Sequence, residues 1–255
     1  MTTPTPAAAP TLEWLGQAGF ALRADEYCVV FDPYLSDLCQ RVHGLVRQVA
    51  APASPTSLKA QWVLISHWHE DHLDLDSAAE FAATGARFVA PPSCVARLAG
   101  MGIDPAALVT LQAGATMSDD TVSISAVAAR HAVPGFLTED AVGYVVEIGG
   151  ARIYHSGDTE YDRVLLAATE QGRLDVALLC TNGTAGNMNV VEAAALAAQL
   201  APARAVPMHF GMWLETGYGP GATLDPRQFV ELYRRLCPDA AATIPELHTR
   251  ISVRA

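Results

Sequence analysis

The sequence predicts an α+β fold in which two mixed β-sheets are flanked by helices. Short apolar runs rich in valine, isoleucine and aromatic residues recur along the 255-residue chain, and their length and β-branching favour strands over helices. Early in the chain these runs follow one another in hairpin-like pairs, whereas helical stretches separate them later. This order favours two mixed sheets over one doubly wound parallel sheet.

Each strand is expected where one of these apolar runs stands. The expected strands are residues 13–15, 20–22, 28–31, 62–65, 87–89, 122–127, 143–148, 152–154, 176–180, 205–208 and 250–253. Helices are expected at residues 77–83, 93–99, 161–169, 190–200 and 226–236. The last two have marked starts. Asn189 is an expected N-cap with Glu192 in the capping-box position, and Asp225-Pro226 combines an N-cap with a proline at the first helical position.

The stretch from residue 36 to residue 61 contains Pro52 and Pro55 and few strand signals. Segments of this length without regular structure are usually functional or disordered, so we predict that it is a lid over a site. The chain length and the 51% hydrophobic content fit one globular domain over residues 11–255, preceded by a flexible tail at residues 1–10.

The composition excludes several classes of partner. The 27 acidic and 16 basic residues give a formal charge of −11, which repels phosphate backbones and disfavours nucleic acid as a partner. The alanine-rich stretch 191–201 is interrupted by Glu192 and Gln199, and is shorter than the roughly 20 apolar residues of a membrane span. We therefore expect a small-molecule substrate and no membrane contact.

The cysteines and the N-terminus bear on the compartment. The five cysteines are scattered, odd in number and without a C-x-x-C pair, a pattern that favours reduced thiols in a cytosol over a disulfide framework. The start MTTPTPAAAP has neither a basic nor an apolar signal-peptide region. We expect a cytoplasmic protein.

The stretch SHWHEDHLD at residues 66–74 concentrates metal ligands. His67 and His69 stand two residues apart after an expected buried strand, so an extended backbone would point both side chains the same way. Asp71 and His72 follow in the expected turn. Imidazole and carboxylate groups are the usual nitrogen and oxygen ligands of zinc and similar ions. Two sets of ligands so close together could serve two ions.

Three further candidates each stand just past an expected strand, namely His131, Asp158 and His209. Ligands from different strand ends can converge on one edge of a sheet, where rigid elements hold metal geometry. Alone, Asp158 would be a turn residue. A single histidine is most often an ordinary polar residue, so His43, His155 and His248 receive no metal role.

Together, H-x-H-x-D-H at residues 67–72, the later histidine, the aspartate of Gly157-Asp158-Thr159 and the final histidine resemble the metallo-β-lactamase superfamily. The resemblance implies a four-layer αββα sandwich with a two-metal site at one edge of the β layers. It implies that His67, His69 and His131 hold one metal, that Asp71, His72 and His209 hold the other, and that Asp158 bridges them. The implied cofactors are two divalent ions, Zn²⁺ or Mn²⁺.

Further local motifs narrow the resemblance. WLGQAGF at residues 14–20, DPY at 32–34, YHSGDT at 154–159, GNMN at 186–189 and PMHFGMW at 207–213 resemble the L-ascorbate-6-phosphate lactonase-like branch. The branch implies a cytosolic hydrolase that opens a lactone or a related ester, and a homo-oligomer is plausible by the same resemblance. It is also loosely similar to N-acyl-phosphatidylethanolamine phospholipase D, which leaves phosphodiester cleavage open.

The expected mechanism needs no serine or cysteine nucleophile, because a hydroxide bridging two cations would attack a carbonyl that the cations polarise. Asp71 could pass a proton to the leaving alkoxide, or it could act as a ligand only. The alternatives to an ester hydrolase are a phosphodiesterase on the same site and a metal-binding sensor without catalysis.

Residues outside the ligand set could contact substrate. Asn182 could point its amide at the substrate, and Arg41 and Arg47 could bind an anionic group, although solvated loop charges are the commoner case. Other residues could wall the pocket, support a ligand from behind or contact substrate. Helix capping, core packing or solvent exposure is the more ordinary role of such residues. They are Asn187, Asn189, Trp68, Trp213, Tyr218, Asp74, Glu70 and Thr159.

Overall fold

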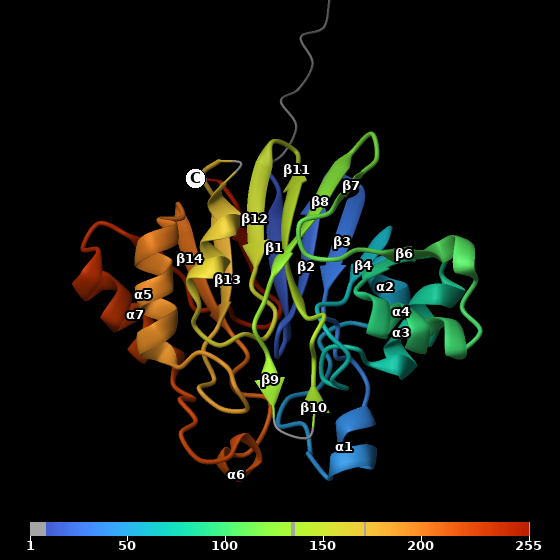
Figure 1. Ribbon diagram of the computed structural model, residues 1–255, viewed down its shortest axis with the longest axis horizontal. Helices are drawn as coiled ribbons and strands as arrows, with labels where there is room; N and C mark the ends of the chain where they lie inside the picture. The colour runs from blue at the N-terminus through green and yellow to red at the C-terminus, as the bar shows by residue number, and fades with distance from the viewer. Residues whose placement is uncertain (1–8, 134–135, 171, 255) are drawn as a thin grey trace, which may run out of the picture.

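Two mixed β-sheets face each other and helices cover the outer face of each (Figure 1). The computed structural model describes residues 9–133, 136–170 and 172–254. Helices α5 (Val190–Leu200) and α7 (Pro226–Leu236) lie outside one sheet. Helices α3 (Leu75–Ala83) and α4 (Pro92–Gly100) lie outside the other. The predicted αββα sandwich is confirmed.

The first sheet combines antiparallel and parallel strands. Its order is β16 (Arg250–Ser252), β1 (Thr11–Gly16), β2 (Gly19–Ala24), β3 (Tyr27–Phe31), β4 (Trp62–Leu64), β5 (Arg87–Ala90) and β6 (Leu108–Thr110). Pairing is antiparallel from β16 to β3 and parallel from β3 to β6. The parallel half places the ends of successive strands at one edge, where loops can meet.

The second sheet repeats this arrangement. Its order is β15 (Ala241–Ala242), β14 (Arg204–Met208), β13 (Val176–Cys180), β12 (Ala151–His155), β11 (Val142–Ile148), β8 (Val122–Ala128) and β7 (Thr116–Ser118). Pairing is antiparallel from β7 to β12 and parallel from β12 to β15. A small hairpin of β9 (Ala132–Val133) and β10 (Phe136–Leu137) stands apart at one end.

The central strands of the first sheet, β2, β3 and β4, are buried on both faces. In β3, Val29 and Phe31 pack into the apolar layer between the sheets, whereas Cys28 and Val30 pack into the layer beneath α3 and α4. Alternate side chains of a strand point to opposite faces, so each strand needs apolar residues in both registers. This explains why the strands appear in the sequence as continuous apolar runs.

Helices α5 and α7 have the predicted bounds because their caps are encoded locally. The Asn189 side chain accepts from the backbone N–H groups of Val191 and Glu192, and Glu192 accepts from Asn189 N. Asp225 accepts from Arg227 N at the start of α7. The stretch 161–169 differs from prediction, because it forms a 3₁₀ helix, η2 (Arg163–Thr169).

The segment 36–61 contains two short helices, α1 (Leu38–His43) and α2 (Pro55–Leu58). Figure 1 shows α1 at the same end of the molecule as α6 (Glu215–Tyr218) and the β9–β10 hairpin. A short 3₁₀ helix, η1 (Pro105–Ala107), precedes β6. Of the tail predicted at residues 1–10, residues 1–8 lie outside the described residues. The Pro10 carbonyl accepts from Val253 N at 2.9 Å. No helix among the described residues is long and apolar enough to cross a membrane.

Candidate metal centre

Three histidine side chains meet beyond the ends of β4 and β8. His67 and His69 stand in the turn between β4 and α3, and His131 lies between β8 and β9. His69 Nδ1 lies 3.1 Å from His67 Nε2 and 3.2 Å from His131 Nε2. All three ligand atoms lie within 4.8 Å of one another, so this group could hold one cation.

A second group forms beside the first. Asp71 and His72 belong to the turn that carries His67, and His209 follows β14. His209 Nε2 lies 3.4 Å from Asp71 Oδ2, and His72 Nε2 lies 3.8 Å from the same oxygen. Their ligand atoms also lie within 4.8 Å of one another, so this group could hold another cation.

Asp158 lies between the two groups. Its Oδ1 is 3.4 Å from His72 Nε2, and its Oδ2 is 3.2 Å from His209 Nε2 and 3.9 Å from His131 Nε2. Gly157 permits this approach, because a Cβ there would lie 2.8 Å from the Val142 carbonyl oxygen. Asp158 therefore reaches both groups, as the resemblance implies.

Two buried atoms of the ligand set support cation binding independently of the resemblance. His72 Nε2 and Asp158 Oδ1 are buried and have no hydrogen-bond partner. Leaving a buried acceptor unsatisfied costs about 1–3 kcal/mol, so such atoms are expected to have a partner. Both atoms face each other within the ligand set, and imidazole nitrogen and carboxylate oxygen are suitable donors for a divalent ion.

Asp32 fixes the ring of His72 from behind. Its Oδ2 lies 2.8 Å from His72 Nδ1 and accepts from the Ser66 hydroxyl at 2.6 Å, while Oδ1 accepts from Ser66 N at 2.7 Å. Because the carboxylate can only accept, one His72 proton stays on Nδ1, so Nε2 is the ring atom that can bind a cation once it has released any second proton. The burial of Asp32 opposes its ionisation, but His72 outweighs this effect and lowers the pKa of the carboxyl.

Three non-glycine residues of the site have left-handed backbone. Gln17, Asp32 and His209 have φ values of 52°, 38° and 66°. Such conformations cost on the order of 1–3 kcal/mol each and persist where the surroundings enforce them, often at functional sites. His209 N donates to the Gln17 carbonyl at 3.0 Å, which ties two of these residues together.

The electrostatics differ between the two groups of ligands. Burial lowers the pKa of His131 to about 4, and Asp158 offsets only part of this shift. For His209, burial opposes protonation, but Asp158 and Asp71 outweigh it and raise the pKa to about 9. Burial also opposes ionisation of Asp158, whereas His209 and His72 hold its pKa well below the ordinary value. The carboxylates therefore stay charged, the state in which they bind cations.

Three carboxamides surround the ligands. Gln17 Nε2 donates to Asp71 Oδ2 at 2.8 Å, and Asn187 Nδ2 donates to Asp158 Oδ2 at 2.6 Å. Asn182 Nδ2 lies 3.0 Å from His209 Nδ1. Sequence reasoning assigned no role to Gln17 or Asp32. Their only signal was their place in the WLGQAGF and DPY motifs, because their partners lie far away in the chain.

A cavity of about 150 Å³ opens on the ligand set. It is lined by Leu45, His69, Asp71, His131, Asp158, Asn182, Thr184, Ala185, Asn187, His209, Trp213, Gly217 and Tyr218. Asn182, Trp213 and Tyr218, which the sequence suggests as neighbours of a substrate, line this cavity. Tyr218 presents its ring, because its hydroxyl already accepts from Met212 N and Trp213 N.

Arg41 and Arg47 are not among the residues lining this cavity, and both guanidinium groups have other partners. Arg47 donates to the carbonyls of Tyr34, Ser36 and Val49, and stacks over the Tyr34 ring. Arg41 pairs with Asp37 and Asp76 at the surface. The segment 36–61 contributes Leu45 to the cavity instead.

The remaining candidates have structural contacts. Asp74 caps α3 and also accepts from Ser36 N. Glu70 pairs with His43 at 3.0 Å, and the Thr159 hydroxyl accepts from Arg130 N. His155 Nε2 donates to the Ala18 carbonyl, and the ring stacks on Phe31. Arg97 lies over the Trp68 ring, and His248 is exposed. None of these contacts brings a further ligand into the cluster.

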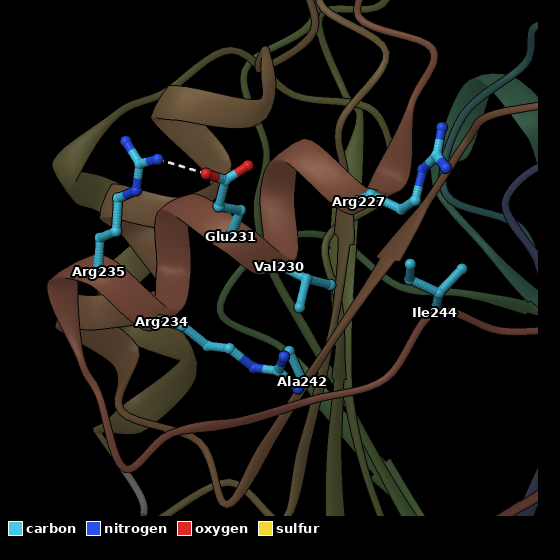
Figure 2. Close-up of a pocket in the computed structure, with 7 residues that line it drawn as sticks. All are labelled: Arg227, Val230, Glu231, Arg234, Arg235, Ala242 and Ile244. Atoms are coloured by element: carbon cyan, nitrogen blue, oxygen red, sulfur yellow. Dashed lines mark hydrogen bonds and ion pairs between the residues drawn. The ribbon is translucent and has the colours of Figure 1, made fainter.

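Figure 2 shows a roomier hollow of about 710 Å³ between α7 and β15. Arg227, Arg234 and Arg235 line it together with the apolar residues Val230, Ala242 and Ile244. Arg235 pairs with Glu231, and Arg227 pairs with Asp225. The lining residues contain no histidine or cysteine, and the groups of possible metal ligands among the described residues lie at the smaller cavity.

Two facing mixed sheets, outer helices and a histidine–aspartate cluster beyond the strand ends define the class of metallo-β-lactamase-fold proteins. The model of the β-lactamase superfamily domain matches residues 27–210. The chain is 31% identical over 226 residues to a UPF0173 metal-dependent hydrolase of Thermococcus onnurineus, covering 87% of this chain and 91% of that protein. The chain belongs to the β-lactamase superfamily, among its UPF0173 metal-dependent hydrolases.

Solved structures with low identity share the fold. Igni18, a metallo hydrolase of Ignicoccus hospitalis, superposes with a TM-score of 0.77 at 21% identity, covering 96% of this chain and 98% of that chain. An isothiocyanate hydrolase from Delia radicum gut bacteria gives a TM-score of 0.75 at 16% identity, covering 96% and 100%. At these identities the likeness concerns the fold alone.

Proposed function

We propose that this protein is a two-cation hydrolase that opens a lactone or a related small ester. The observation that carries the proposal is the cavity onto which both ligand groups and the shared Asp158 open. A structural zinc site is closed by four ligands, whereas catalysis requires a side open to substrate. The open side disfavours the alternative of a metal-binding sensor without catalysis.

In this proposal the two ligand groups have separate tasks. His67, His69 and His131 would hold one Zn²⁺ or Mn²⁺ ion, and Asp71, His72 and His209 would hold the other, with Asp158 between them. Such a pair of ions lowers the pKa of water toward neutrality and polarises the oxygen of the bond that is cleaved.

Asp71 is the residue proposed to move a proton. Its side chain is 20% exposed, whereas those of His72 and Asp158 are 0% and 5% exposed, so Asp71 is the carboxylate with the most access to the cavity. Burial opposes its ionisation, but His72 and His209 outweigh it and lower the pKa of the carboxyl. Ionised Asp71 can accept a proton from the attacking water and then pass it to the leaving alkoxide.

The size of the cavity supports a small substrate. A cavity of about 150 Å³ can hold a molecule the size of benzene, which matches a five- or six-membered lactone ring. We propose a small-molecule substrate, no nucleic-acid or membrane partner and a cytoplasmic location. All five cysteines are free thiols, which supports this location. A homo-oligomer remains part of the proposal by family resemblance.

The test compares the wild type with His67→Ala, with the metal content of each measured. Both proteins are assayed with a panel of lactones, linear esters and bis-aryl phosphodiesters. The matched control is His248→Asn, an exposed histidine at φ 61°, where asparagine tolerates the backbone. Hydrolysis of esters by the wild type and the control, lost in His67→Ala, is the expected result. Turnover of phosphodiesters only would favour the phosphodiesterase, and two bound metals without any turnover would favour the sensor.

A further inference from the structure

We propose that the substrate is uncharged and carries a hydroxyl or similar hydrogen-bond donor, and that it is not a phosphorylated lactone. This inference rests on the proposed ester hydrolysis and narrows its substrate class. It is carried by the part of the cavity wall that is not made of metal ligands and by the buried carboxamide oxygen of Asn187, which, like that of Asn182, has no hydrogen-bond partner.

Apart from the ligand histidines and the ions that they would hold, the described wall offers no cation that could pair with a phosphate group. Among the described residues that line the cavity, none is a lysine or an arginine. Leu45, Trp213 and Tyr218 form its apolar side and pack together with Tyr34 and Leu38. A phosphate placed against this side would lose its water without gaining a partner, and burying an unpaired charge is costly.

The segment 36–61 carries Arg41 and Arg47, but neither arginine lines the cavity. Leu45 stands between Arg41 and Arg47 in the sequence, yet it is the leucine that reaches the cavity. Arg47 donates to three carbonyl oxygens, which would have to be left unsatisfied if its guanidinium turned toward a ligand. The segment thus supplies an apolar contact and keeps its charges elsewhere.

Asn187 is the residue proposed to recognise a hydrogen-bond donor on the substrate. Its Nδ2 donates to Asp158 Oδ2 at 2.6 Å, which fixes the orientation of the carboxamide. The other end, Oδ1, is buried and has no hydrogen-bond partner, and the residue is only 8% exposed. A hydroxyl or N–H group on a substrate in the cavity would satisfy this acceptor. A substrate without a donor would leave it unpaired.

The experiment compares three lactones of similar ring size that are unsubstituted, hydroxylated and phosphorylated. We expect kcat/KM to be highest for the hydroxylated lactone, to fall about 2- to 10-fold without the hydroxyl, and to be lowest for the phosphorylated one. Two variants test the wall. Leu45→Arg should shift the preference toward the phosphorylated lactone, whereas Val46→Arg should not, because Val46 is 50% exposed and does not line the cavity.

The outcomes separate the two proposals. If the wild type prefers the phosphorylated lactone, the inference is wrong while ester hydrolysis stands. If the unsubstituted lactone is as good a substrate as the hydroxylated one, the role of Asn187 is wrong. If no lactone or ester is hydrolysed by the metal-loaded wild type, the proposed function fails, and the inference fails with it. Thermal melting of both arginine variants distinguishes a change of preference from a loss of fold.

Discussion

Replacing Asp32 by asparagine exchanges one carboxylate oxygen for an NH₂ group and should selectively weaken one cation. Asp32 accepts three hydrogen bonds, from Ser66 N, from the Ser66 hydroxyl and from His72 Nδ1. An asparagine of the same shape has one oxygen and one NH₂ group, so it cannot accept at both ends. Either orientation of the amide creates a mismatch.

Each mismatch has a definite consequence. If the NH₂ group replaces Oδ2, the His72 ring must accept at Nδ1, its proton moves to Nε2, and this atom stops being a ligand. If the NH₂ group replaces Oδ1, it meets the Ser66 N–H, which cannot become an acceptor. An unsatisfied buried donor costs about 1–3 kcal/mol. Loss of a partner that orients a metal ligand typically weakens metal binding about 10- to 100-fold. We therefore expect a loss of this size for the cation held by His72. The cation of the three-histidine group should be little affected.

The assay is a titration of the metal-free protein with Zn²⁺ or Mn²⁺ against a competing chelator, with two binding constants fitted. Asp140→Asn is the matched control, because Asp140 accepts from Ser93 N and the Ser93 hydroxyl, both at 2.8 Å, but contacts no histidine. Wild-type affinity for both cations in Asp32→Asn would refute the reasoning about the proton on His72. An equal loss in Asp140→Asn would assign the effect to general destabilisation.

Three further predictions concern other parts of the chain. Gln17→Met removes the amide that donates to Asp71 Oδ2 at 2.8 Å. It should weaken the cation held by Asp71, His72 and His209 about 10-fold. The matched control Gln61→Met, at a glutamine that accepts from Cys28 N, should not weaken it, and calorimetric titration measures both variants. Asp119 has its pKa lowered to about 2, because the Tyr27 hydroxyl and the Thr121 and Val122 N–H groups outweigh its slight burial. A lowered pKa stabilises the fold at pH values above the ordinary pKa, and this contribution is lost as the pH falls toward 2. Asp119→Asn should therefore lower the free energy of unfolding at pH 7 by less than about 1 kcal/mol, because the group is exposed. Near pH 2 the variant and the wild type should be equally stable, and urea titrations at both pH values check this. Removing both cations with a chelator should lower the melting temperature, since each ion present at 100 times its dissociation constant adds about 2.7 kcal/mol; an unchanged melting temperature in scanning calorimetry would contradict occupancy of the site.

The parts of the fold that the sequence predicts well are those encoded locally. Helices α5 and α7 begin and end at the predicted residues because Asn189 and Asp225 cap them within a few residues. Strands β6, β7 and β15 were missed, since they have only two or three residues and no buried apolar run. Their strand state comes from pairing with neighbours, which no short window of sequence contains.

The same distinction applies to the site. The cluster at residues 67–72 stands out because its ligands are adjacent in the chain. Gln17 and Asp32 act through partners that lie 192 and 40 residues away, so their contacts appear only after folding. Arg47 shows the opposite case. Its charge predicted an anion contact, but it donates to the backbone carbonyls of Tyr34, Ser36 and Val49, and these contacts depend on the path of the loop.

The proposed hydrolysis depends most on the division of the ligands into two cation sites. Anomalous X-ray diffraction from crystals of the Mn²⁺- or Zn²⁺-loaded protein tests this division directly. We expect two anomalous peaks per chain, one among His67 Nε2, His69 Nδ1 and His131 Nε2, and one among Asp71 Oδ2, His72 Nε2 and His209 Nε2, with Asp158 touching both. A single peak in a fully loaded protein, or peaks away from these atoms, would contradict it.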